Sequence, residues 1–105
     1  MKLHQNLALG IVSCLNDILK QKKALRPSLN QLLKQNRKWG SRDRRLLGES
    51  VLEIIRWKRL FTEIGKLNPK SNQYYWNLLG IWMLKKKIPL QDWGYFSEIK
   101  AESID

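Results

Sequence analysis

Apolar residues recur at three- and four-residue steps along most of this 105-residue chain, and this spacing constrains its fold more than any other feature. The first example lies within residues 2–22: Leu3, Leu7, Ile11, Leu15, Ile18 and Leu19. Such steps are the period of a helix with one buried stripe, whereas a half-buried strand alternates apolar and polar residues. No stretch of the sequence shows that alternation. The sequence therefore predicts an all-α fold.

Proline, glycine and serine mark the ends of the next two predicted helices. Pro27 suits the first turn of a second helix, because its missing N–H costs nothing there, and this helix is expected to end near Asn36. Gly40 breaks the pattern after it. Ser41 is then predicted to be the N-cap of a third helix over about residues 41–64, the longest of the chain.

Two further segments follow the third helix. Ser71 is expected to cap a fourth helix over about residues 72–86, and Pro89 restarts the chain before a short fifth helical segment over about 90–98. The fourth helix has a predicted buried stripe: Tyr75, Leu78, Leu79, Trp82 and Met83. The short connections favour a compact bundle of four to five helices over a solenoid.

The third predicted helix has two faces of different chemistry. At about 100° per residue, its apolar residues cluster on one side: Leu47, Val51, Ile54, Trp57 and Phe61. Four arginines lie within about 100° of one another on the other side: Arg42, Arg45, Arg56 and Arg59. Glu49 lies among these arginines, one turn from Arg45, and can pair with it. Leu52 is an apolar exception on the same face.

The charge of the chain indicates a polyanionic partner. Lys and Arg number 20 against 9 Asp and Glu, which gives a formal net charge of +11. A surface this basic attracts nucleic acid, the commonest polyanion in a cell. Guanidinium groups bind phosphate through paired N–H donors, and the positive end of the third helix favours the same ligand. The predicted RNA-binding residues are Arg37, Lys38, Arg42, Arg45, Arg56 and Arg59.

Three features of this basic region each allow two interpretations. Trp39 either stacks on an unpaired base from the loop before the third helix, or fills the core between the second and third helices. The arginines either contact phosphate or form a solvated face paired with Glu49 and Glu53. The lysine run at residues 85–87 either provides a second phosphate contact or complements the helix dipole.

The sequence contains no recognisable set of catalytic or metal-binding residues. Cys14 lies on the apolar side of the first helix and is expected to be a buried, inert thiol, and His4 is expected at the surface. One His and one Cys cannot build a tetrahedral zinc site without several suitably spaced carboxylates. Three glycines within helical patterns are expected to allow close helix packing: Gly10, Gly48 and Gly80. We therefore expect no enzyme activity, cofactor or metal in this chain alone.

The composition also predicts a location. A hydrophobic fraction of 43% supplies a core and argues against disorder. A single cysteine permits no internal disulfide, which suits a reducing cytoplasm. The longest apolar run is far short of the ~18 residues that span a bilayer, and no signal-peptide pattern opens the sequence. A cytoplasmic protein that does not enter the membrane is therefore expected.

Residues 39–57 also resemble a known family. Residues 39–49 read WGSRDRRLLGE and residues 51–57 read VLEIIRW. An Asp-Arg pair that opens a long helix, an apolar stripe and a closing Arg-Trp pair resemble the signature helix of NusB-like domains. The version here is most similar to the N-terminal domain of Sun/Fmu-type (RsmB-like) ribosomal RNA cytosine-C5 methyltransferases. The resemblance is closest over about residues 1–65 and looser over 66–105.

This resemblance implies a NusB-like RNA-binding domain over residues 1–100, with 101–105 as the start of a linker or tail. In that family the domain positions ribosomal RNA for a separate catalytic domain, which binds S-adenosylmethionine and is expected outside this chain. The alternatives are a stand-alone NusB-like antitermination or protein-interaction module and a DNA-binding helix-turn-helix. Stand-alone NusB proteins hold RNA with an arginine-rich N-terminal segment, whereas this N-terminus offers only Lys2 and His4. The main RNA site is therefore expected on the third helix.

Overall fold

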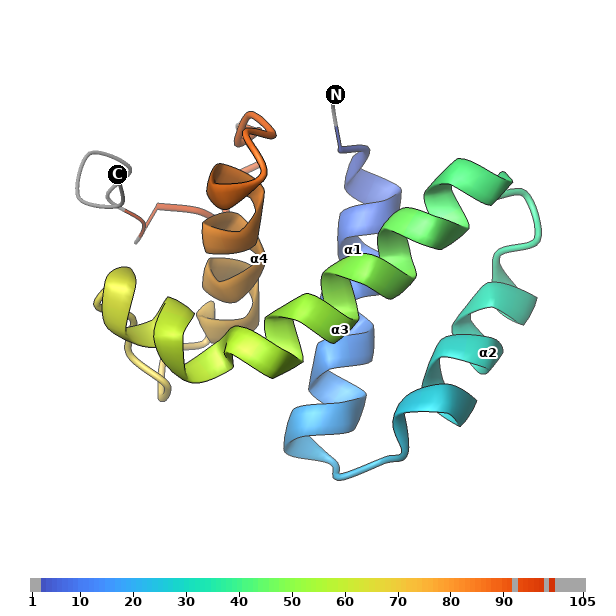
Figure 1. Ribbon diagram of the computed structural model, residues 1–105, viewed down its shortest axis with the longest axis horizontal. Coiled ribbons are helices and arrows are strands. Elements are labelled where there is room, and N and C mark those ends of the chain that lie inside the picture. Colours follow the sequence, from blue (N-terminus) through green and yellow to red (C-terminus); the bar gives the residue numbers. More distant parts are fainter. Residues whose placement is uncertain (1–2, 92, 98, 100–105) are drawn as a thin grey trace.

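Helices form all of the regular secondary structure in the described part of the chain. A computed structural model describes residues 3–91, 93–97 and 99 (Figure 1). Their elements are α1 (Gln5–Leu15), the π-helical turn η1 (Asn16–Lys20), α2 (Leu25–Gln35), α3 (Ser41–Ile64) and α4 (Tyr74–Lys85). Pro27 lies in the first turn of α2, as predicted. The described residues contain no strand, so the prediction of an all-α fold is confirmed.

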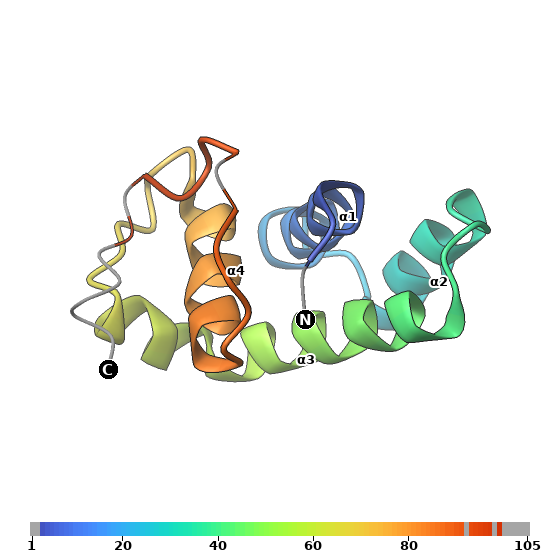
Figure 2. The same cartoon turned by 90° about the horizontal axis from the view of Figure 1, so that it is seen from above.

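The other helices lie on one side of α3. With 24 residues at about 1.5 Å each, α3 is about 36 Å long, which matches the longest extent of the molecule, 37 Å. Figure 2 shows α1, α2 and α4 on the same side of this rod. α3 packs against both α1 and α4, and α1 also packs against α4. In the described part of the chain, the opposite side of α3 therefore has no covering helix.

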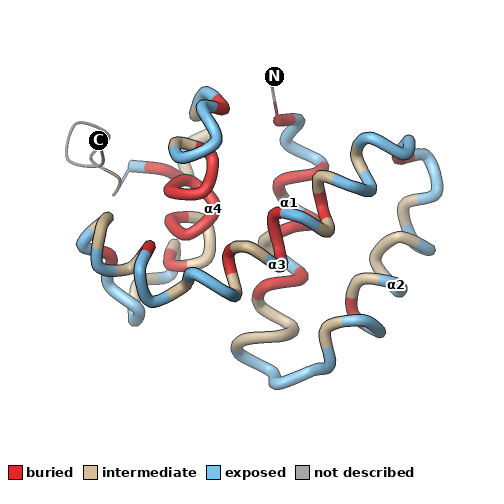
Figure 3. Tube along the Cα trace, in the orientation of Figure 1, coloured by how far each residue is buried: buried red, intermediate tan, exposed pale blue. Residues whose placement is uncertain are grey.

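The core lies where α1, α3 and α4 meet (Figure 3). Its fully buried side chains come from all three helices and include Leu7, Ile11, Leu15, Leu47, Ile54, Leu78, Ile81 and Trp82. Four of the five residues predicted on the buried side of α3 are buried: Leu47, Val51, Ile54 and Phe61. Each of the three helices therefore buries an apolar stripe in the core, and the burial of these stripes holds the helices together.

The prediction that Trp57 is buried is wrong, because its side chain is 44% exposed. The backbone at Trp57 (φ −107°, ψ 18°) departs from helical geometry inside α3. A regular helix advances by about 100° per residue, and this departure interrupts that progression. Helical periodicity alone therefore predicts the wrong exposure for the residue at the kink.

Two predicted caps differ from the observed helix ends. Gly40 and not Ser41 is the N-cap of α3, and Ser41 is the first helical residue, without a side-chain capping bond. Ser71 Oγ accepts a hydrogen bond from the Gln73 N–H at 3.1 Å, but α4 begins only at Tyr74. Ser71 therefore stabilises the turn that leads into α4 and does not cap the helix directly.

The fifth helical segment expected over residues 90–98 does not form in the residues described there. Residues 93–95 form a bend, and Gly94 adopts φ +83°, a left-handed conformation that does not fit a right-handed helix. Phe96 is nevertheless buried, with 8% of its side chain exposed. The linker or tail predicted at 101–105 lies outside the described residues.

Trp39, in the loop between α2 and α3, packs against α1. Its side chain is 9% exposed, and a Cβ atom on Gly10 would lie only 2.7 Å from its Cη2 atom. Gly10 permits this contact because it has no Cβ atom. The interpretation that Trp39 fills the core is therefore confirmed. Burial of the ring argues against the alternative, in which Trp39 stacks on an unpaired base.

The prediction of close helix packing is wrong for Gly48, and the close neighbours of Gly80 lie in the non-helical segment after α4. A Cβ atom on Gly80 of α4 would meet Ile99 and would lie 3.1 Å from Phe96 Cδ1. Gly48 of α3, in contrast, has no atom within 4 Å of its Cβ position. No neighbouring side chain or backbone atom therefore requires a glycine at position 48.

Alanine substitutions at Gly10 and Gly48 test this packing. In Gly10→Ala the Trp39 ring must move, and this overpacking destabilises the fold by about 1–3 kcal/mol. That cost exceeds the ~1 kcal/mol by which alanine stabilises a helix relative to glycine. Gly48→Ala gains the propensity without a steric cost. In urea unfolding followed by circular dichroism, we expect Gly10→Ala to lower the free energy of unfolding and Gly48→Ala to raise it by up to about 1 kcal/mol. Equal shifts in one direction would contradict the packing of Trp39 on α1.

Candidate nucleic-acid interface

Four exposed arginines lie along α3: Arg42, Arg45, Arg56 and Arg59. We call this set the arginine face. The buried residues of α3 face α1 and α4, and α2 also lies on that side of the rod (Figures 2 and 3). The exposure that the helical period predicts is therefore confirmed for all four arginines.

The arginine face consists of two pairs. Residues three apart in a helix are neighbours on its surface, so Arg42 lies beside Arg45, and Arg56 lies beside Arg59. Arg42 and Arg56 are 14 residues apart, which corresponds to about 21 Å along the helix axis. An extended polyanion can therefore contact the two pairs at separate points of its backbone.

No carboxylate in the described part of the chain neutralises the arginine face. Within residues 3–91, 93–97 and 99, none of its four guanidinium groups lies within ion-pair distance of a carboxylate. The pairing of Arg45 with Glu49 that the sequence allows is therefore not observed among these residues. Glu53, the other candidate partner, pairs instead with Lys86 Nζ at 3.1 Å. Within the described residues, no acidic side chain therefore competes with an external anion for these arginines.

A second group of cations lies at the turn between α2 and α3. Arg37 and Lys38 are exposed there, and together with Lys34 they line a cleft. Arg44 Nε donates a hydrogen bond to the Trp39 carbonyl oxygen at 3.2 Å, which ties the start of α3 to this turn. Arg37 and Arg44 also line a common cleft. The cations of the turn therefore adjoin the start of α3, where the helix dipole adds partial positive charge.

The lysine run at the end of α4 lies beside the middle of α3. Lys85, Lys86 and Lys87 are exposed, and the ion pair between Lys86 and Glu53 connects the two helices. Both side chains of this pair are partly exposed, so the pair contributes at most about 1 kcal/mol to stability. Glu53 is three residues from Arg56, and the lysine run is therefore next to the second arginine pair.

The structure also exposes apolar side chains on α3 that sequence reasoning mostly missed. Trp57 and Leu60 are each 44% exposed, and Leu52, the predicted exception, is 51% exposed. The Arg56 guanidinium carbon lies 5.3 Å from the centroid of the Trp57 ring, within the range of a cation–π contact. The helical period places Leu60 one turn from Arg56 and could have indicated its exposure. No such signal exists for Trp57, because it lies at the kink.

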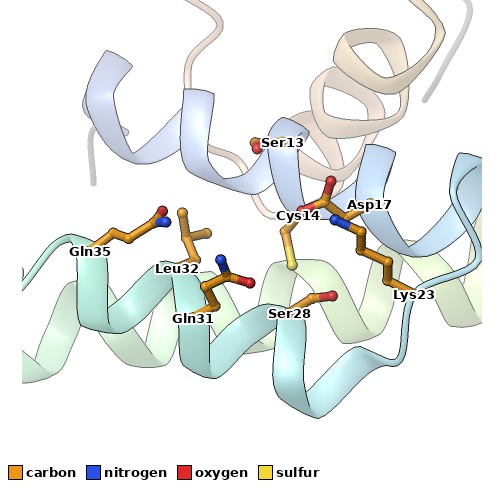
Figure 4. Close-up of a pocket in the computed structure, with 8 residues that line it drawn as sticks. All are labelled: Ser13, Cys14, Asp17, Lys23, Ser28, Gln31, Leu32 and Gln35. Carbon is orange, nitrogen blue, oxygen red and sulfur yellow. The ribbon is translucent and has the colours of Figure 1, made fainter.

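A small polar cleft between α1 and α2 contains the cysteine (Figure 4). Cys14 is 2% exposed, as predicted for a buried thiol. Burial and the nearby Asp17 carboxylate raise the pKa of Cys14 from 9.0 to about 11. In Figure 4 the side chain of Lys23 points toward Asp17, and Ser28 lies across the cleft from the sulfur. At neutral pH the sulfur is therefore a protonated thiol and not a nucleophilic thiolate.

The remaining candidate residues form no further catalytic or metal-binding site in the described part of the chain. His4 is exposed just before α1, as predicted. Among the described residues, no three His, Cys, Asp or Glu side chains lie close enough together to hold a metal ion. No helix in this part of the chain has both the length and the apolar character needed to cross a bilayer.

Comparisons with known proteins found no counterpart of this chain: no family model, no curated protein and no solved structure matches it. Its function is therefore inferred from the fold and from the chemistry of its surface.

The raised pKa of Cys14 predicts a pH dependence of stability. Because the folded-state pKa of about 11 lies above the unfolded value of 9.0, the protonated thiol stabilises the fold fully below pH 9, and this contribution is lost as the pH rises through about 11. Two pKa units correspond to about 2–3 kcal/mol. The measurement is the free energy of unfolding in urea from neutral to strongly alkaline pH. Over this range, the free energy of unfolding should fall by about 2–3 kcal/mol more for the native protein than for Cys14→Ala. Cys14→Ala retains every lysine and tyrosine, so the two proteins differ only in the thiol. Parallel curves of unfolding free energy against pH would therefore refute the effect.

Proposed function

We propose that this chain is an RNA-binding module without catalytic activity of its own, and that the arginine face is its RNA-binding surface. One observation supports this proposal above all. The four arginines are exposed on the uncovered side of α3, and no carboxylate of the described residues neutralises them. A guanidinium group binds phosphate through two parallel N–H donors, so the four together offer strong, oriented contacts to a phosphate backbone.

The proposed surface continues from the arginine face onto neighbouring elements. Arg37 and Lys38 extend it across the turn before α3, and the lysine run at the end of α4 extends it beside Arg56. A formal net charge of +11 adds a long-range attraction for polyanions to these local contacts. A nucleic acid strand is the ligand that matches both the extent and the sign of this surface.

We further propose that the chain is the NusB-like domain of a Sun/Fmu-type ribosomal RNA cytosine-C5 methyltransferase. The residues that carry the resemblance, 39–57, form the turn before α3 and the greater part of α3 itself. The same residues supply the arginine face except for Arg59. In this proposal the domain holds ribosomal RNA, and S-adenosylmethionine binds to a separate catalytic domain.

A protein-interaction module, of the kind used in antitermination, is a second candidate that one observation favours. Leu52, Trp57 and Leu60 expose apolar surface on α3, and in other proteins contiguous exposed apolar surface marks a protein contact. A protein partner that remains bound in stoichiometric amount after nuclease treatment, and that Leu52→Asp releases, would favour this function over RNA binding.

Removal of each arginine pair tests the proposed RNA surface. The log affinity for a nucleic acid falls linearly with log salt concentration, with a slope of about 0.7 per phosphate contact for single strands. Arg42→Ala/Arg45→Ala and Arg56→Ala/Arg59→Ala should therefore each weaken binding and reduce this slope by about 1.4. The measurement is fluorescence anisotropy of a labelled hairpin RNA with an unpaired loop, titrated over a series of salt concentrations.

A Lys20→Ala/Arg26→Ala variant is the matched control for this experiment. It removes the same charge from two exposed residues that flank the turn between η1 and α2, away from the arginine face. The control should keep the salt slope of the native protein, and circular dichroism should show equal helicity in all variants. A control slope as low as that of the arginine variants would mean that binding follows net charge alone, and the proposed surface would be wrong.

A further inference from the structure

We propose that Trp57 is a base-stacking residue, so that the arginine face binds an unpaired RNA segment and not a closed duplex. This inference rests on the proposed RNA-binding function and adds the class of RNA to it. Three observations support it: the exposure of the ring, the kink at which the residue lies, and the Arg56 cation beside the ring.

Trp57 differs from the other tryptophans, all of which lie in the described part of the chain. Trp39 and Trp82 are buried, and Trp76 and Trp93 are partly buried against the core. Trp57 is 44% exposed. An indole in water lacks the favourable burial that a core position provides, and a flat ligand that covers the ring supplies that burial on binding.

The kink in α3 accompanies this exposure. Ile54 and Phe61, one turn before and one turn after Trp57, are both buried. An uninterrupted helix would place Trp57 near these two residues, at the edge of the core. The backbone instead leaves helical geometry at Trp57 (φ −107°, ψ 18°), and the ring is exposed between two buried neighbours. The kink therefore separates this ring from the apolar stripe of its own helix.

Arg56, the first member of the second arginine pair, lies next to this ring. The Arg56 guanidinium carbon is 5.3 Å from the Trp57 ring centroid, and Arg59 is exposed two residues further along α3. Each base of a nucleic acid is joined to its phosphate through one sugar, so a base stacked on Trp57 brings its phosphates toward the Arg56 guanidinium group. Stacking on an aromatic side chain beside a cationic surface is a general mode of single-strand binding.

The chemistry of stacking selects unpaired RNA. In a duplex, bases stack on one another and present only their edges, whereas an unpaired base presents its flat face to an aromatic side chain. Leu52 and Leu60 expose a similar fraction of their surface on the same helix but have no aromatic face. Trp57 therefore distinguishes between unpaired and paired RNA in a way that a purely apolar contact does not.

The test compares three variants on two probes. The variants are Trp57→Ala, Trp57→Phe and, as the matched control, Leu60→Ala, which removes an equally exposed apolar side chain. The probes are a labelled single-stranded RNA of mixed sequence and the same strand annealed to its complement. We expect Trp57→Ala to weaken single-strand binding about tenfold, to leave duplex binding within about twofold and to keep the salt slope. Trp57→Phe should retain most of the affinity, and Leu60→Ala should bind both probes like the native protein.

Tryptophan fluorescence gives a second readout that does not depend on the alanine variant. Single-stranded RNA should quench part of the emission of the native protein, because a base stacks on an exposed indole. Trp57→Phe should bind the RNA and lose this quenching. Quenching that persists unchanged in Trp57→Phe would overturn the proposal.

The remaining outcomes separate this inference from the proposed function. If the arginine variants reduce the salt slope but Trp57→Ala binds single strands normally, the RNA surface stands and the stacking role is wrong. If Leu60→Ala and Trp57→Ala weaken binding of both probes equally, the apolar side chains make a general contact, as a protein-docking surface would, and stacking is again wrong. If no variant affects RNA binding, or the native protein does not bind RNA, the proposed function itself fails.

Discussion

The one-sided burial of α3 is the interaction on which the rest of the structure depends. Leu47, Val51 and Ile54 are fully buried against the neighbouring helices, and each contributes about 1.5–3 kcal/mol of burial free energy. These residues share one side of the helix, so the opposite side must face solvent or a ligand. Guanidinium groups remain hydrated there at no desolvation cost. The same helix therefore anchors the core and presents the basic surface.

The parts of this arrangement that follow from helical periodicity can be read from the sequence. The buried apolar residues of α3 keep a helical spacing from Leu47 to Phe61, with Trp57 as the exception. The bounds of the helix and the exposure of the arginine face are therefore predictable. The burial of Cys14 is predictable for the same reason, because Ile11 and Leu15, which adjoin it on the helix, are apolar and buried. In each case the local pattern and the tertiary structure require the same orientation of the side chain.

The parts that depend on contacts between distant segments cannot be read in this way. Whether Glu53 pairs with an arginine on its own helix or with Lys86 depends on where α4 crosses α3, and the sequence alone does not specify that crossing. Trp39 is buried because α1 offers a glycine at the point of contact, a match between residues that are far apart in sequence. Trp57 and Gly94 depend on local backbone conformations, a kink and a left-handed residue, that a helical period does not encode.

The kink at Trp57 makes the two arginine pairs geometrically different. Arg42 and Arg45 belong to one uninterrupted stretch of α3, so their backbone atoms keep the spacing of a regular α-helix. Arg56 and Arg59 lie on either side of the kink, so the non-helical backbone at Trp57 sets their spacing. An ideal helix therefore describes the first pair and does not describe the second.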